Sequence, residues 1–176
     1  MKTFSLTSHK HQKGAAAVEF ALICMLFFTI LFGILELGRM MYLYNTMQEV
    51  TRRGARAAVV RWIDQGAAIK SIALFGGTSI PAGSEVTTAN IKIEYLNKAG
   101  AAASPLPVDP GDNLAACGNI TLATSCIYSV RVSIVDIDGT SLLSYSPMVS
   151  LFSTLFNVNL PAASVTMHAE SLGFEV

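Results

Sequence analysis

Residues 15–35 are the feature that most limits how this chain can fold. All 21 of these positions are apolar or small, except Glu19 and Thr29. At about 1.5 Å of rise per residue, a helix of this length is about 30 Å long, which is the thickness of one hydrocarbon core. Buried helices of soluble proteins are usually shorter and keep a polar face. The segment therefore predicts a transmembrane helix.

The leader that precedes this span is short and basic, as in a secretory signal. Its lysines are Lys2, Lys10 and Lys13. An ordinary signal peptidase needs small residues after the apolar region, but here they come before it, at Gly14 and residues 15–17. A cut that uses these small residues would leave the apolar helix on the mature protein.

Helical spacing continues past the span, over residues 37–62. Apolar or small residues recur there at intervals of three and four: Met40, Leu43, Met47, Val50, Gly54 and Ala57. The opposite stripe is polar: Asn45, Glu49, Arg52, Arg53 and Arg56. This pattern predicts an amphipathic helical stalk. Its small residues near Gly54 would let a sheet or a second helix approach closely, either within the chain or in a neighbouring subunit.

Residues 63–176 read as a small α+β domain. Alternating apolar and polar side chains predict strands at residues 91–95, 128–134 and 165–170. Helices are predicted at residues 67–75, stopped by Gly76 and Gly77, and at residues 146–156, with Ser146 as N-cap and Pro147 as first helical residue. Residues 100–113, rich in Ala, Pro, Gly and Asp, are expected to form a loop. The predicted fold class is α+β, with a long N-terminal transmembrane and stalk helix and a small antiparallel β-sheet domain.

Composition and motifs speak against several classes of function. Twelve basic residues balance twelve acidic ones, so nothing indicates nucleic-acid binding. His168 is the only histidine beyond the leader, and no nucleophile or carboxylate is placed to serve it. Asp136 and Asp138 begin like a calcium-binding loop, but the later ligands of such a loop are missing. The sequence Asp138-Gly139 is better interpreted as a turn. We expect no catalytic residue, no metal, no cofactor and no small-molecule substrate.

The start of the span resembles the processing site of type IV pilin-like proteins. The basic leader is followed by Gly14, then Ala-Ala-Ala-Val, then Glu19 and Phe20. Further on, residues 36–59, ELGRMMYLYNTMQEVTRRGARAAV, are similar to the TadE-like pseudopilin family of the tight-adherence (Flp) type IV pilus system, and residues 164–170 look like that family's closing strand. The resemblance implies a pilin-like fold, no enzymatic activity, and a cut by a prepilin peptidase between Gly14 and Ala15.

The resemblance also implies a place and partners for the chain. The chain would be a minor pseudopilin in the bacterial inner membrane, and it could also enter the pilus fibre. Its partners would be other pilin or pseudopilin subunits and the pilus assembly machinery. The four expected regions are a cleavable leader at residues 1–14, a transmembrane helix at 15–36, the stalk at 37–62 and a periplasmic domain at 63–176. Lys10 and Lys13 lie directly beside the span, which favours a cytoplasmic leader.

Glu19 lies near the start of the apolar span. A carboxylate there is energetically costly unless it is paired, protonated or in contact with water. After a cut at Gly14, the α-amine of Ala15 would lie about 6 Å away along the helix. We expect the Glu19 of one subunit to meet this amine in another, which would make Glu19, followed by Phe20, an assembly and register position. The alternative is an interfacial carboxylate that reaches water without a partner.

The three cysteines divide into one in the span, Cys24, and two beyond it. In an oxidising periplasm, Cys117 and Cys126 are close enough in sequence to close a small disulfide loop. The alternatives are two free thiols, or a zinc site that would need further ligands.

A different class of function also fits an N-terminal membrane helix. The chain would then be a membrane-tethered periplasmic binding module unrelated to pilus assembly, with the helix as a simple tether. A tether needs no glycine five residues before Glu19 and no cut on the cytoplasmic side, so processing at Gly14 distinguishes the two.

Overall fold

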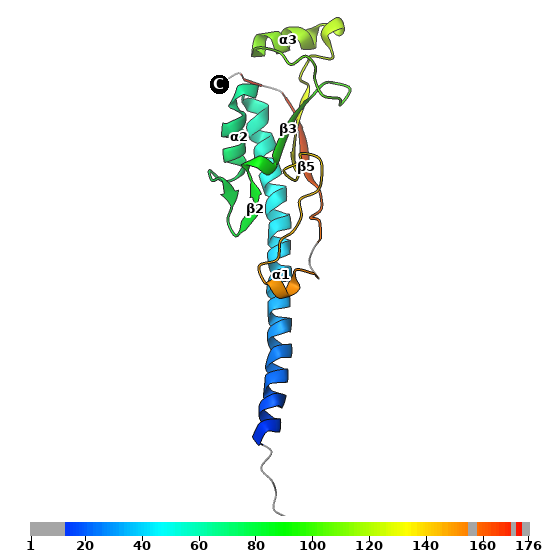
Figure 1. The fold of residues 1–176 in the computed structure, drawn as a ribbon. Helices are drawn as coiled ribbons and strands as arrows, with labels where there is room; N and C mark the ends of the chain where they lie inside the picture. The colour runs from blue at the N-terminus through cyan, green and yellow to red at the C-terminus, as the bar shows by residue number, and fades with distance from the viewer. Residues whose placement is uncertain (1–12, 155–157, 170–171, 174–176) are drawn as a thin grey trace, which may run out of the picture.

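A single helix runs through most of the length of the molecule (Figure 1). The computed structural model describes residues 13–154, 158–169 and 172–173. Outside these ranges lie leader residues 1–12, the end of the predicted second helix at Leu155 and Phe156, and the end of the last predicted strand at Glu170. Helix α1 spans Lys13–Val60, 48 residues without a break, or about 72 Å. The predicted transmembrane and stalk segments are therefore parts of one helix. A small head is built around its far half, whereas the near half stands free.

The head contains a three-stranded antiparallel sheet with β4 in the centre. Its strands are β3 (Ile91–Leu96), β4 (Ser129–Ile134) and β5 (Ala163–His168), in the order β3-β4-β5. All three predicted strands are confirmed. The inward residues Val130, Val132 and Ile134 are buried, and on the other face Glu94 of β3 pairs with Lys92 and with Arg131 of β4. The alternation of the sequence thus separates a core face from a charged face.

A second helix and a hairpin complete the packing around α1. Helix α2 spans Gly66–Ala73 and is followed by positive φ angles at Phe75 and Gly76, so the predicted helix with its glycine stop is confirmed. Strands β1 (Ser79–Ile80) and β2 (Gly83–Thr87) form an antiparallel hairpin whose turn holds Pro81 and Ala82. These two short strands were not predicted from the sequence. Short 3-10 helices occupy Ile63–Gln65, Thr88–Asn90, Ile120–Leu122 and Ser150–Phe152.

The apolar stripe predicted on the stalk faces the core of the head. Leu43, Met47 and Val50 are at most 1% exposed. At Gly54 the sheet and α2 come very close: a Cβ built there would lie 3.1 Å from Cγ1 of Val132 and 3.3 Å from Cβ of Ala73. The small residues of the stalk therefore serve packing within the chain.

The predicted helix at residues 146–156 is wrong over its described part. Residues 146–149 are not helical, and only Ser150–Phe152 form a 3-10 turn. The flanking chain is extended and pairs with the segment that returns toward β5, through Tyr145 N to Val158 O and Leu160 N to Leu143 O. Ser-Pro favours the start of a helix in isolation. Here the contacts of Tyr145 and Met148 with Glu36 of α1 keep this segment out of a helix.

The predicted loop at residues 100–113 is also partly wrong, because helix α3 spans Pro110–Gly118. The Asp109 carboxylate accepts a hydrogen bond from the amide of Asp112 at 2.7 Å, and Pro110 follows as the first helical residue. Both are standard signals for a helix start. The small and turn-forming residues around them concealed this signal.

Candidate functional site

The N-terminal end of α1 carries the predicted processing and assembly residues. Gly14 and Ala15 are exposed, and a Cβ built on Gly14 would meet nothing within 4 Å. Phe20 is 70% exposed. Glu19 is exposed as well, and it makes no hydrogen bond or ion pair with any residue that the structure describes. The structure thus brings Gly14, Ala15, Glu19 and Phe20 together on the free end of the helix. Glu19 has no partner there among the residues that the structure describes.

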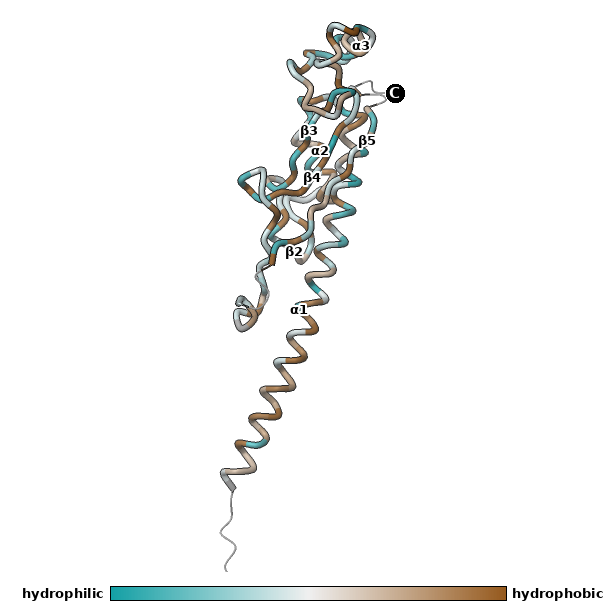
Figure 2. The backbone as a smooth tube through the Cα atoms, turned by 90° about the vertical axis from the view of Figure 1, so that its right-hand side faces the viewer, coloured by the Kyte–Doolittle hydropathy of each residue, from teal (hydrophilic) through white to brown (hydrophobic). Residues whose placement is uncertain are grey.

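The free half of α1 presents apolar side chains to its surroundings all the way round. Figure 2 shows this half as hydrophobic almost throughout. Its most apolar stretch is long enough to cross a bilayer, and none of it is buried in the head. Exposed side chains include Leu22, Ile23, Leu26, Phe27 and Ile34. A helix of this kind is stable only if lipid or other helices cover it.

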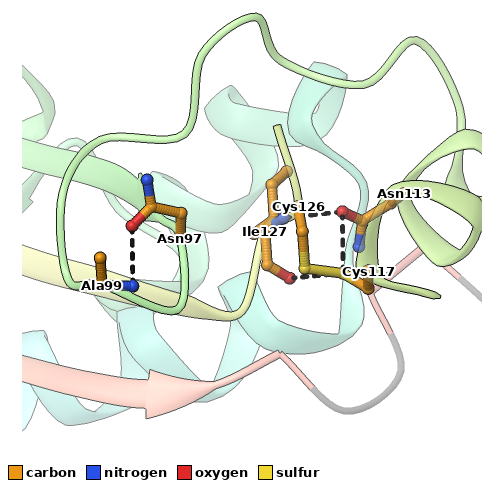
Figure 3. The surroundings of a disulfide bond; sticks show 6 residues. All are labelled: Asn97, Ala99, Asn113, Cys117, Cys126 and Ile127. Atoms are coloured by element: carbon orange, nitrogen blue, oxygen red, sulfur yellow. Dashed lines mark hydrogen bonds between the residues drawn. A yellow bond between two sulfur atoms is a disulfide. The ribbon is translucent and has the colours of Figure 1, made fainter. Parts of the chain in front are cut away.

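The far end of the head carries the cysteine pair. The structure joins Cys117, in α3, to Cys126 by a disulfide, shown in Figure 3. Beside it, Oδ1 of Asn113 accepts a hydrogen bond from the amide of Ile127 at 2.8 Å, which ties α3 to the start of β4. Cys24 is a free thiol in the apolar half of α1.

We expect Cys117 and Cys126 to be oxidised in protein purified from its native membrane, because an oxidising compartment preserves such pairs. Alkylation of the denatured protein without reductant should then label Cys24 alone, and prior reduction should expose all three thiols. In a Cys24→Ser variant the unreduced protein should take no label. Labelling of all three cysteines without reductant would show that the loop is open or that the head lies in a reducing compartment.

A buried charged cluster lies where α1 leaves its free half and enters the head. Glu36, only 3% exposed, is its centre. The Oε1 atom of Glu36 accepts hydrogen bonds from the Tyr145 hydroxyl and, at 3.1 Å, from the amide of Met148. Nη1 of Arg39 lies 3.6 Å from the same oxygen. A carboxylate at the end of an apolar span is thereby satisfied by the protein itself.

Arg39 joins this cluster to the hairpin on the other side. Its guanidinium donates to Ser146 O at 2.8 Å, to Ala82 O at 3.4 Å and to the carboxylate of Glu85. It also lies 5.2 Å from the centre of the Tyr145 ring, within the range of a cation–π contact. One arginine of α1 thus ties down two segments that are distant in sequence.

The environment of the cluster favours a neutral Tyr145 and a charged Arg39. Burial, together with the hydrogen bond to Glu36, raises the pKa of Tyr145 to about 12. Burial alone would lower the pKa of Arg39, but the hydrogen bonds to Glu85 and Tyr145 outweigh it and raise that pKa. Tyr145 is therefore a hydrogen-bond donor to Glu36 over the whole physiological range.

Sequence reasoning did not identify this cluster as a site. The i, i+3 spacing of Glu36 and Arg39 was visible, but a local pair of that kind is common on helix surfaces. Its partners, Glu85 and Tyr145, lie 46 and 109 residues away along the chain. No local pattern connects them.

Three further observations bear on the chemistry of the head. An open hollow of about 430 Å³ lies between α3 and β5, lined in part by Asn113, Tyr128 and His168. Among the described residues, no group of three or more His, Cys, Asp or Glu side chains is placed to hold a metal ion. The Asp138 carboxylate accepts hydrogen bonds from the Ser141 hydroxyl and from the amides of Thr140 and Ser141, the latter two at 2.9 Å. The bond from the hydroxyl, followed by those from the two amides, lowers the pKa of Asp138 to about 2. Asp138 thus shapes the turn that its sequence predicted.

In this protein an exposed apolar helix continues into the core of a small α+β head. This arrangement is typical of proteins that are anchored in a membrane by an N-terminal helix. The model of the family described as TadE-like protein matches residues 14–56. This confirms the resemblance over residues 14–56, which run from the free end of α1 into the head. No curated protein and no solved structure matches the chain significantly. The match and the apolar helix fit a membrane protein associated with the tight-adherence pilus, from a family that is structural rather than enzymatic.

Proposed function

We propose that this protein is a minor pseudopilin of a tight-adherence (Flp) pilus, which a prepilin peptidase cuts after Gly14 and which helix α1 anchors in the bacterial inner membrane. The observation that carries the proposal is the extent of the family match, which begins at Gly14 and covers the whole free half of α1. A match confined to the stalk or head would leave the processing site without support. In this arrangement the leader is cytoplasmic and the head is periplasmic.

The two ends of the molecule would have different tasks. The free half of α1 would pack in the membrane against the helices of other pilin or pseudopilin subunits, because no described residue of the head buries its most apolar stretch. Glu19 lacks a partner within the described chain, which supports a partner in another subunit. The head would contact the assembly machinery or a neighbouring head.

Processing is the direct test of this proposal. The mature chain should begin at Ala15, and Gly14→Leu should block the cut while leaving membrane insertion intact, because a large side chain hinders access to the backbone at the scissile bond. The measurement is the intact mass and N-terminal peptide of protein purified from membranes of cells that carry the peptidase.

Gly38→Leu is the matched control, since Gly38 is exposed on the same helix and a Cβ there meets nothing within 4 Å. This variant should be cut normally. A purified chain whose first peptide starts at Met1, or beyond Leu35, would contradict the proposed processing and favour the tethered binding module.

A further inference from the structure

The covered face of α1 extends farther toward the membrane than the amphipathic stalk pattern predicted. Below Met40, Glu36 is buried and Gly33 is half-buried, whereas the residues beside them are exposed. The spacing of three and four from Gly33 through Glu36 and Met40 to Leu43 places these residues on one helix face. The head therefore reaches down over the last turn of the apolar span.

The segment that covers this face is residues 145–152. Tyr145 and the amide of Met148 bind Glu36, as described above. Farther along, a Cβ built on Gly33 would lie 3.9 Å from Cζ of the Phe152 ring, and Phe152 is only 4% exposed. In Figure 1 this part of the chain lies beside α1, below the sheet and toward the free half of the helix.

The depth of this contact follows from the helix itself. Gly33 lies two residues inside Leu35, the end of the apolar span, which corresponds to about 3 Å along the helix axis. If residues 15–35 fill the hydrocarbon core, Phe152 lies at its boundary and the surrounding loop lies in the interfacial layer of the bilayer.

The composition of the loop suits this depth. Residues 139–167 form a run of 29 without Asp, Glu, Lys, Arg or His. Met148 is 76% exposed although it is apolar, and the backbone of the same residue is held by Glu36. Charged groups would be costly at this level, whereas an exposed apolar side chain would gain from contact with lipid.

We propose that residues 146–154 form a second membrane contact, an uncharged loop seated in the interface of the same bilayer that α1 crosses, with lipid as its partner. The Glu36 cluster holds this loop at the correct height, because Tyr145 and the amide of Met148 bind a fixed point on α1. The head then rests on the membrane instead of standing above it on a bare stalk. This proposal depends on the membrane placement of α1, so its test includes a reporter of that placement.

The test uses tryptophan quenching in the full-length protein, reconstituted into phospholipid vesicles that contain lipids brominated either near the glycerol end or near the methyl end of the acyl chains. Trp62, the single tryptophan, lies beyond the far end of α1 and supplies the baseline. Three variants each add one tryptophan. Met148→Trp reports on the loop and Phe28→Trp reports on the span. Ile120→Trp is the control, because Ile120 is 94% exposed and lies in the short 3-10 helix that contacts α3.

In vesicles with the shallow bromines, the fluorescence added by Met148→Trp should fall about twofold, and the deep bromines should quench it less. Phe28→Trp should show the reverse order, and Ile120→Trp should remain at the baseline. Because Met148 is largely exposed, its replacement should not disturb the fold.

Two results would overturn this inference alone, and a third would overturn the proposed function with it. If Phe28→Trp is quenched while Met148→Trp behaves like Ile120→Trp, α1 spans the bilayer but the loop does not touch it. A blue-shifted but unquenched Met148→Trp would also contradict the proposal, since protein, such as a second copy of the chain, would then cover the loop. If Phe28→Trp itself is unquenched, the membrane anchor fails, and with it both this proposal and the proposed function.

Discussion

A Glu19→Ala protein should insert into the membrane and be cut after Gly14 like the wild type, yet it should no longer co-purify with its partner pilin subunits. Removal of a carboxylate makes the span more apolar, so insertion is not impaired. Assembly is a different matter, because the mature α-amine at Ala15 would lose its counter-charge. An unpaired charge in an apolar setting costs about 2 to 3 kcal/mol, and less near the interface.

Crosslinking and co-purification from membranes measure this loss. Thr29→Ala is the matched control within the span. The Thr29 hydroxyl already donates to Met25 O of its own helix at 2.7 Å, so it needs no hydrogen-bond partner in another subunit. That variant should assemble normally. Should Glu19→Ala join its partners as well as the wild type does, Glu19 is an interfacial carboxylate that reaches water and sets no register.

Gly54→Leu should unfold the head or greatly weaken it. A Cβ at Gly54 already approaches Val132 of β4 and Ala73 of α2 more closely than ordinary contact allows, so a full leucine must push the sheet or α2 away from α1. We expect a loss of about 3 kcal/mol in the free energy of unfolding, at the upper end of overpacking effects. Denaturant unfolding of the full chain in detergent, followed by near-ultraviolet circular dichroism, measures it.

Gly38→Leu serves again as control, because it makes the same change on an exposed part of the same helix. There the gain in helix propensity should stabilise the protein by about 0.5 to 1 kcal/mol or leave it unchanged. Similar losses in both variants would mean that leucine disturbs α1 itself, and the close approach of sheet and helix at Gly54 would not be the cause.

The elements predicted well from the sequence are those with a strong local period. Strand β4 alternates cleanly, with Val130, Val132 and Ile134 on one face, and the stalk repeats at three and four residues from Met40 onward. Such periods reflect burial of one side of an element, which is a property of the element itself. The free end of α1, with Gly14 and Glu19, was likewise recognisable, because neither its length nor its composition depends on the head.

The wrong predictions concern segments whose local signals were weak or were overruled. Helix α3 does have an N-cap at Asp109, but the small residues on both sides resembled a loop. At Ser146 and Pro147 the local preference for a helix start was real, yet Tyr145 and Met148 are held by Glu36. Contacts across more than 100 residues outweigh the few tenths of a kcal/mol that separate local conformations.

By itself, therefore, the sequence determined the apolar helix, the candidate cut at Gly14, the place of Glu19 near the start of the span and the inward faces of the strands, since each follows from charge and period along a short stretch. Only the tertiary structure decided how low the head sits on α1. That height depends on Glu36 and Arg39 meeting Tyr145 and Glu85, and on the Phe152 ring lying against Gly33. These residues come together only when the sheet, the hairpin and the helix are all in place, because burial of a charged group is tolerated only where its partners are already positioned.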